Sequence, residues 1–167
     1  MANEVACYNQ LVPATAPLED TIVRAERALT DLIRLFNRPA VQRRLMAQAD
    51  IAIEVSACWA LGRLGQLGPS RPSDLATSLG VDASSITHRV QALERAGYVE
   101  RLADPADGRA CVVGLSAAGA AALARLRAAR GAFIERLLTG WEDEERNTFS
   151  LALDRVREAL EKEIREA

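Results

Sequence analysis

The sequence predicts a mainly α-helical fold that includes one small β-hairpin. Only 4% of the 167 residues are aromatic, whereas alanine and leucine are abundant, and this composition favours helices over sheets. Near both ends of the chain, apolar residues recur at spacings of three and four, the pattern of one helix face. The stretch between them combines two short helical patterns with two strand patterns. The expected parts are a flexible N-terminal arm, N-terminal scaffold and dimerisation helices, a compact module and C-terminal dimerisation helices, at residues 1–16, 17–67, 68–116 and 117–167.

The first long helix is expected between about Pro17 and Asn37. Proline suits its first turn, and Pro39 stops it. Shorter helices are expected at about 40–48 and 53–67. The apolar residues of the first helix follow a heptad seam: Leu18, Ile22, Ala25, Leu29, Leu32 and Phe36.

Two further helices are expected after the module. Ser116 is placed to cap a helix that runs to about Thr139, where Gly140 breaks it. The last helix begins with four acidic residues, which suit the positive N-terminal end of a helix. Its apolar stripe consists of Phe149, Leu153, Val156, Leu160 and Ile164.

The apolar faces of the terminal helices exceed what the core of a small module requires. Packing within one chain is one interpretation of these faces. A symmetric dimer, the commonest soluble oligomer, is the other, and it explains the surplus. The residues expected at the dimer interface are Leu18, Ile22, Leu29, Phe149, Leu153, Val156 and Leu160.

The central module begins with two short helices joined by a tight turn. Ser73 is expected to cap the first helix, which ends at Leu79. Gly80 permits the left-handed backbone that the turn requires. Asp82 is expected to cap the second helix, which ends at Gly97. Two helices in this arrangement form a helix-turn-helix.

The second helix of this motif has an apolar face and a polar face. Ile86, Val90 and Leu93 point to one side at about 100° per residue. A major groove about 12 Å wide admits one helix, and hydroxyl, amide and guanidinium groups read base edges there. We therefore predict that the opposite face binds DNA through Ser84, Ser85, Thr87, His88, Gln91 and Arg95.

Four residues beside this face have further expected roles. Arg71, just before the first helix, is predicted to contact a DNA phosphate, and Ser73 is a further candidate for DNA binding. Arg89 lies at the edge of the buried face, where a phosphate contact and an internal ion pair are equally compatible with the pattern. Ser85 has an alternative role in the cap at Asp82.

A hairpin directly after the second helix predicts a wing. Residues 98–102 and 111–115 read as strands, and residues 104–109 form a tip rich in turn-forming residues. Arg109 at this tip is predicted to enter a narrow, electronegative minor groove. Asp107 is predicted to hold Arg109 through a charge-assisted hydrogen bond. The fold is therefore a winged helix-turn-helix with a helical dimerisation layer from both termini.

The module resembles the MarR family of bacterial transcription regulators. The resemblance rests on the helix-turn-helix, the Asp-x-Arg of the wing and the Leu-Ser…Gly that follows, which are specific only in combination. The flanking helices also match the family's order, so the resemblance spans nearly the whole chain. The matching residues are Leu75, Ala76, Leu79, Gly80, Val81, Ser84, Ser85, Ile86, Thr87, Val90, Leu93, Glu94, Gly97 to Arg101, Asp104, Asp107, Gly108, Arg109, Val113 to Ser116 and Gly119.

The resemblance implies a homodimer that binds a pseudo-palindromic operator on double-stranded DNA. It also implies a repressor that a small effector, for example an aromatic compound, releases from DNA. Phe36 and Trp59 are the candidates for lining an effector pocket, and Cys7 is the candidate for a redox-sensing alternative. The chain departs from the family pattern at His88, where relatives often carry arginine, and in its weakly basic wing.

The charge distribution leaves a second function open. The chain has a net charge of −2, and residues 68–116 carry five arginines against six acidic residues. DNA affinity must therefore come from a few well-placed arginines. The alternative is a winged-helix module that binds a protein partner in place of DNA.

Other classes of function find no support in the sequence. A single histidine and three scattered cysteines argue against a metal site and a disulfide framework. Cys58 and Cys111 lie in apolar stretches, where burial is expected. No nucleophile–base pair, phosphate loop or dinucleotide motif is recognised, so neither an enzyme nor a cofactor is expected. No signal peptide or membrane-spanning run is recognised, which favours the cytoplasm.

Overall fold

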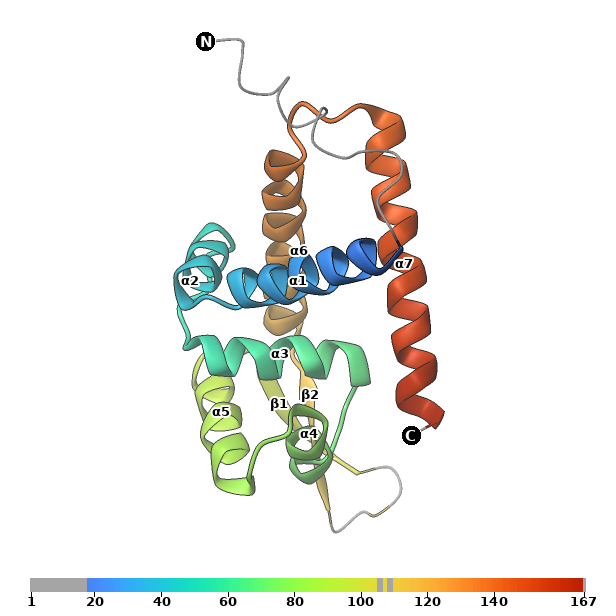
Figure 1. Ribbon diagram of the computed structural model, residues 1–167. Coiled ribbons are helices and arrows are strands. Elements are labelled where there is room, and N and C mark those ends of the chain that lie inside the picture. The colour runs from blue at the N-terminus through green and yellow to red at the C-terminus, as the bar shows by residue number, and fades with distance from the viewer. Residues whose placement is uncertain (1–17, 105–106, 108–109, 167) are drawn as a thin grey trace. The chain divides into compact units, whose positions relative to one another are not determined.

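The computed structural model describes residues 18–104, 107 and 110–166 of the chain. Within these residues the chain forms seven helices and one two-stranded sheet (Figure 1). In chain order they are α1 (Leu18–Phe36), α2 (Pro39–Gln48), α3 (Val55–Leu67), α4 (Pro72–Leu79), α5 (Ala83–Arg95), β1 (Val99–Ala103), β2 (Cys111–Leu115), α6 (Ala117–Leu137) and α7 (Asp143–Glu166). The predicted fold class, mainly helical with an antiparallel wing, is confirmed.

The chain divides into two compact units, residues 1–44 and 45–167. In the first unit α2 begins at Pro39, one residue earlier than expected, because the fixed backbone angle of proline fits the first turn of a helix. Gln42 is buried, and its side-chain amide donates a hydrogen bond of 2.7 Å to the carbonyl oxygen of Phe36. This bond satisfies one of the free carbonyls at the end of α1.

The second unit contains the compact module, with α3 as its central support. α3 packs against α4, α5, β2 and α6, and Figure 1 shows α4, α5 and the strands gathered beneath it. Burial of aliphatic side chains supplies the main favourable free energy of folding. The side chains buried most completely in this core include Leu61, Leu64, Leu75, Ile86, Leu93, Val113 and Leu126.

The turn between α4 and α5 is built as the sequence predicts, but the start of α4 is not. Gly80 adopts the left-handed conformation with φ of +63°, which lets the chain reverse after Leu79. The prediction that Ser73 caps α4 is wrong, because the helix begins at Pro72 and Arg71 is its N-cap residue. Proline is well suited to the first helical position, since the N–H that it lacks has no partner there.

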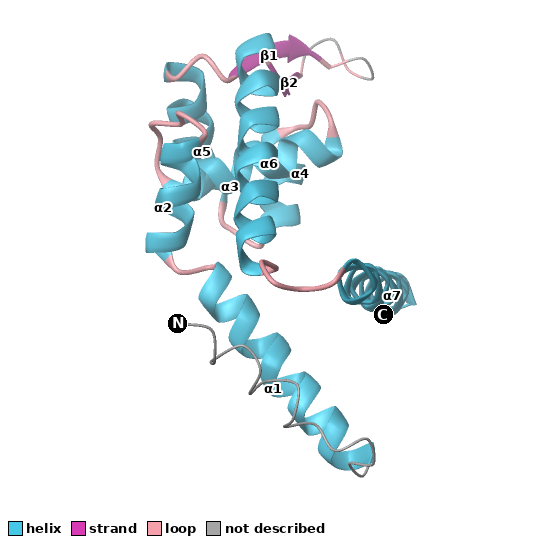
Figure 2. Ribbon diagram, turned by 90° about the horizontal axis from the view of Figure 1, so that it is seen from above, coloured by secondary structure: helices cyan, strands magenta, loops and turns pink. Residues whose placement is uncertain are grey.

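The wing is an antiparallel pair of strands, drawn in magenta in Figure 2. Val99 pairs with Leu115 and Ala103 pairs with Cys111. Ser70 extends the pairing on the other side of β2 through two backbone hydrogen bonds to Val113, of 3.0 and 2.9 Å. The segment between α3 and α4 is thereby attached to the wing.

The wing is joined to α6 by a close approach of two backbone segments. The Ser116 side chain accepts a hydrogen bond from the backbone N–H of Gly119, at 3.0 Å, which confirms it as the N-cap of α6. The same hydroxyl donates to the carbonyl oxygen of Gly97 at 2.6 Å. A Cβ atom at Gly119 would overlap the carbonyl oxygen of Tyr98, so only glycine fits this position.

Candidate nucleic-acid interface

The candidate interface is built on α5, whose N-terminus is fixed by Asp82. One carboxylate oxygen of Asp82 accepts the backbone N–H of Ser85 at 2.8 Å, as a capping residue should. The hydroxyls of Ser84 and Ser85 also donate to this carboxylate. These hydrogen bonds, with that from the Ser84 hydroxyl as the largest contribution, hold the pKa of Asp82 well below its usual range. The predicted cap is confirmed.

Burial separates the two faces of α5 cleanly. Ile86, Val90 and Leu93 are at most 2% exposed and pack into the module. The residues predicted to face DNA lie on the other side: Ser84, Thr87, His88, Gln91 and Arg95 are exposed, and Ser85 is half-buried. The polar face of α5 is therefore available for binding, because the core occupies only the opposite side.

Three hydroxyls of the predicted DNA-binding set already donate hydrogen bonds to α5 or to its N-cap residue. Ser84 and Ser85 donate to Asp82, so Ser85 has the capping role that the sequence left as an alternative. Thr87 donates to the carbonyl oxygen of Ala83 at 2.7 Å. These hydroxyls keep their oxygen lone pairs, but their hydrogens are already in use.

Arg89 stands at the edge of a groove between the start of α3 and α5. The groove has a volume of about 380 Å³, and Arg89 itself is half-buried. No ion pair of Arg89 is found among the described residues, which argues against the internal pairing that the sequence left open. The groove is lined by Glu54, Ser56, Ala57, Ser85, His88, Arg89, Ala92 and Arg95.

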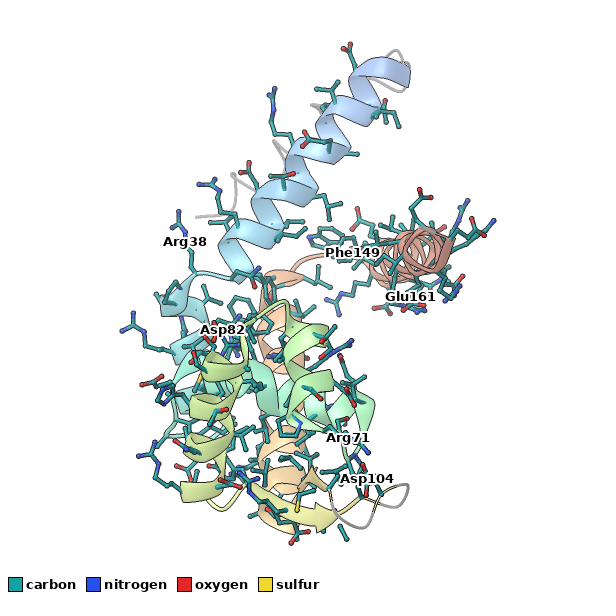
Figure 3. The ribbon with its side chains drawn as sticks, turned by 90° about the horizontal axis from the view of Figure 1, so that it is seen from below. Arg38, Arg71, Asp82, Asp104, Phe149 and Glu161 are labelled. Atoms are coloured by element: carbon teal, nitrogen blue, oxygen red, sulfur yellow. The ribbon has the colours of Figure 1, made fainter. Side chains whose placement is uncertain are left out.

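Arg71 forms a salt bridge with Asp104, which directly follows β1 of the wing (Figure 3). Its Nε donates to a carboxylate oxygen of Asp104 at 2.6 Å. The Asp104 side chain is only 7% exposed, whereas that of Arg71 is 43% exposed. The hydrogen bond to Asp104 raises the pKa of Arg71 further above its already high value. The bridge fixes the loop end of β1 to the start of α4 and leaves part of the guanidinium facing solvent.

A second ion pair connects the wing to α5. Arg101 on β1 donates to Glu94 on α5 at 2.7 Å. Sequence reasoning missed both this pair and the partner of Arg71, because the paired residues lie on different elements. The available signal for Asp104 was an acidic residue placed directly after a predicted strand, since a carboxylate that becomes buried there needs a cation.

The tip of the wing carries the sequence-predicted pair of Asp107 and Arg109. Arg109 lies outside the described residues. Asp107 is exposed, and its backbone N–H and carbonyl bond to Asp104 and Ala110 at 3.3 and 2.8 Å. Ser73, predicted beside Arg71, is exposed on α4 and forms a hydrogen bond of 3.2 Å with Asp74.

The two candidates for an effector pocket occupy different helices. Phe36 is half-buried at the end of α1. Trp59 lies on α3 with 42% of its surface exposed, which is high for a tryptophan in a packed helix.

The residues predicted for dimerisation lie on surfaces rich in exposed apolar side chains. Ile22 and Leu29 on α1 are exposed, and Leu153, Val156 and Leu160 on α7 are exposed as well. Phe149 is half-buried and packs edge-to-face on Trp141, with 5.5 Å between the ring centroids. α1 begins at Leu18, whose side chain lies outside the described residues.

The cysteines differ in environment. Cys58 is buried on α3, and burial raises the pKa of its thiol, which disfavours the reactive thiolate. The expectation that Cys111 is buried is wrong, because the first residue of β2 faces solvent. Cys7 lies outside the described residues.

No group of three or more His, Cys, Asp or Glu side chains that could hold a metal ion occurs in residues 18–104, 107 and 110–166. A search of the same residues finds no helix that is both long and apolar enough to span a membrane.

Comparisons with known proteins agree with this geometry. A family model described as MarR family matches residues 59–111. The chain is 30% identical over 108 residues to the uncharacterized HTH-type transcriptional regulator YxaD of Bacillus subtilis (strain 168), which covers 65% of this chain and 76% of the relative.

Two solved structures illustrate the shared fold. A MarR family protein from Bacillus stearothermophilus superposes with a TM-score of 0.73 at 21% identity, over 87% of this chain and 99% of the other. FabT of Streptococcus pneumoniae, solved in complex with DNA, superposes with a TM-score of 0.62 at 22% identity, over 84% and 98%. At these identities the likeness concerns the fold.

Proposed function

Because the chain belongs to the MarR family of transcription regulators, which bind DNA and are not enzymes, we propose that it is a homodimeric repressor of a pseudo-palindromic operator. In this proposal α5 is the recognition helix and the wing enters the minor groove. A small effector releases the dimer from DNA, and aromatic compounds are the first class to test.

The observation that carries the proposal is the two-sided character of α5. Its apolar side chains are used up in the core, while an uninterrupted polar face is left exposed beside a groove that holds Arg89 and Arg95. A helix of this width fits the major groove, and its phosphate-facing edge needs cations that are not already paired. Both requirements are met on one element.

Exposed apolar side chains on the terminal helices support the dimer. Ile22 is 62% exposed on α1, and Leu160 is 58% exposed on α7. Contiguous exposed apolar side chains on a soluble protein mark interaction surfaces. A two-fold axis would place the recognition helices on half-sites about 34–36 Å apart, which requires a pseudo-palindromic operator.

The test of DNA binding is a mobility-shift titration of the full chain against chromosomal fragments at several salt concentrations. We expect selected fragments to bind, with the logarithm of the affinity falling by about 0.9 per neutralised phosphate for each unit of log salt. Arg95→Ala on α5 should weaken binding and flatten this slope. The matched control, Arg127→Ala on the exposed side of α6, should leave both unchanged. Equal behaviour of the two variants would contradict the assignment of α5.

Release by an effector has a separate test. Phenolic and other aromatic compounds are added to the preformed complex, and loss of the shifted band is measured. An effector can shift the population only if it binds the free and DNA-bound states with different affinity. We expect Trp59→Ala to reduce the response without changing DNA affinity in the absence of the compound. An unchanged response would remove Trp59 from the effector pocket.

A further inference from the structure

We propose that Gln91 reads an adenine in each operator half-site through a pair of hydrogen bonds from its side-chain amide. The inference rests on the proposed function, in which α5 lies in the major groove. It follows from an inventory of which polar atoms on the outer face of α5 remain free to read a base.

The hydroxyl groups on this face already donate their hydrogen bonds within the protein. The hydroxyl hydrogens of Ser84 and Ser85 are directed to Asp82, and that of Thr87 to the carbonyl oxygen of Ala83. Each oxygen can still accept a hydrogen bond from DNA. Cytosine and adenine both offer an amino donor in the major groove, so a lone acceptor does not distinguish them.

Neither Arg95 nor His88, the other long side chains of this face, is suited to select adenine. Arg95 already donates from Nε to the backbone carbonyl of Gln91 at 3.3 Å, so the guanidinium follows the last turn of α5. The two ring nitrogens of His88 point in different directions and cannot both meet the edge of one base. These side chains can add affinity, but they do not supply a planar donor–acceptor pair.

Gln91 does supply such a pair. Its side chain is exposed, and its amide makes no hydrogen bond to any other described residue. The carbonyl oxygen accepts and the NH₂ group donates from the same plane, which matches the N6 donor and N7 acceptor of adenine. Guanine presents two acceptors on this edge, cytosine presents a donor, and thymine presents an acceptor with a methyl group.

The position of Gln91 along the helix agrees with this role. It lies one turn after His88 and one turn before Arg95, on the exposed side of α5 away from the buried Ile86, Val90 and Leu93. Successive residues rise about 1.5 Å along a helix, so His88 and Gln91 are separated by about 4.5 Å along the axis of α5. This separation exceeds the spacing of about 3.4 Å between base pairs, so the two side chains can meet different base pairs in the proposed complex.

The first experiment selects bound sequences from random DNA with the wild-type chain and with Gln91→Ala. We expect the wild-type motif to contain one fixed A·T pair at symmetric positions in both half-sites. In Gln91→Ala this position should become degenerate, while the rest of the motif is retained. Gln48→Ala, which alters an exposed glutamine at the end of α2, is the matched control and should reproduce the wild-type motif.

The second experiment removes the adenine atoms instead of the side chain. The selected adenine is replaced by 7-deazaadenine, which lacks the N7 acceptor, or by purine, which lacks the N6 amino group. Each replacement should weaken binding of the wild-type chain, by about 5- to 150-fold if the whole bidentate pair is lost. The same replacements should have little effect on Gln91→Ala, because the two changes remove the same contact.

The outcomes separate this inference from the proposed function. If the wild-type chain selects a motif but the adenine analogues weaken both proteins equally, the assignment of Gln91 is overturned while sequence-specific binding stands. The assignment is also overturned if the position that loses its preference in Gln91→Ala is a G·C pair in the wild-type motif. Failure of the wild-type chain to select any motif overturns both. Because Gln91 is exposed, the variant should keep its unfolding midpoint, and this is measured in parallel.

Discussion

The central module buries its aliphatic side chains, whereas α7 exposes side chains of the same kind. Leu61 and Leu64 on α3 are 0% exposed, whereas Leu160 and Ile164 on α7 are 58% and 67% exposed. None of the 24 residues of α7 is buried. Both segments carry regularly spaced apolar residues, so the spacing alone does not reveal which of them finds a core within its own chain.

The difference teaches where each helix obtains its stability. The helices of the module are held by burial against one another, which contributes about 1.5–3 kcal/mol for each aliphatic side chain removed from water. The ion pairs of α7 contribute much less free energy of folding than this burial does. Arg157 reaches Asp154 and Glu161 at 3.6 and 3.0 Å, but all three side chains are more than half exposed, and exposed pairs contribute little. We therefore expect α7 to depend on a second copy of the chain.

The largest effect should come from a cavity in the module. Leu64→Ala removes a side chain that is 0% exposed and should lower the free energy of unfolding by about 2–5 kcal/mol. Leu151→Ala makes the same chemical change at a site on α7 that is 56% exposed, and it should change stability by no more than about 0.5 kcal/mol. Urea denaturation of both variants measures the difference. Equal losses would mean that α7 is packed as tightly as the module.

The joint between the wing and α6 offers a test of packing at a single atom. Gly119→Ala places a Cβ against the backbone carbonyl of Tyr98, which cannot rotate away, and should cost about 1–3 kcal/mol. Gly131→Ala is the control on the same helix, where nothing lies within 4 Å of the new Cβ. This change should stabilise α6 by about 0.5–1 kcal/mol, because alanine is the better helix former. Thermal unfolding shifts of the same sign in both variants would contradict the close approach.

The apolar stripe of α7 can be tested against the opposite face of the same helix. Leu160 lies on the stripe with Leu153 and Val156. Leu151 is nearly as exposed but lies on the opposite face of the helix, so Leu151→Ser is the control for Leu160→Ser. We expect Leu160→Ser to raise the dimer dissociation constant by about tenfold for each leucine removed from an interface. Leu151→Ser should leave it unchanged. Sedimentation equilibrium distinguishes the two, and a monomeric wild-type chain would remove the premise.

Local signals in the sequence were sufficient to place α5 and its neighbours. The predicted cap at Asp82 and the predicted end at Gly97 bracket the observed helix, and Gly97 has a φ of +71°. Such signals work because capping and left-handed turns are decided by a few adjacent residues. The predicted cap at Ser73 is wrong because of another adjacent residue: Pro72 occupies the first position of α4, which makes Arg71 the N-cap residue.

Contacts between distant residues could not be predicted in this way. Arg71 and Asp104 are separated by 33 positions, and their pairing depends on how α4 and the wing pack. The pattern of alternating burial also fails at Cys111, because the first residue of β2 lies at the end of the hairpin next to the connecting loop, away from the core. A single sequence shows which residues are charged or apolar, but it does not show which distant residues are in contact in the fold.

The smallest expected effect concerns how α5 and α7 begin. α5 starts with three hydrogen bonds to Asp82, whereas α7 starts with one, from the backbone N–H of Glu142 to Glu145 at 2.9 Å. The depressed pKa of Asp82 means that its ionised form stabilises the folded state. This contribution is complete above the unfolded value of about 3.9 and is lost as the pH falls below it.

Asp82→Asn isolates this contribution, because asparagine retains the capping geometry without the charge. We expect the variant to be less stable than the wild-type chain at pH 7, and the difference to shrink steadily between about pH 4 and pH 2. Ser85→Ala, which removes one donor to Asp82, should show a smaller dependence over the same range. Free energies of unfolding measured across this range provide the comparison. A difference that is constant with pH would mean that the hydrogen-bond geometry, and not the charge of Asp82, determines the start of the recognition helix.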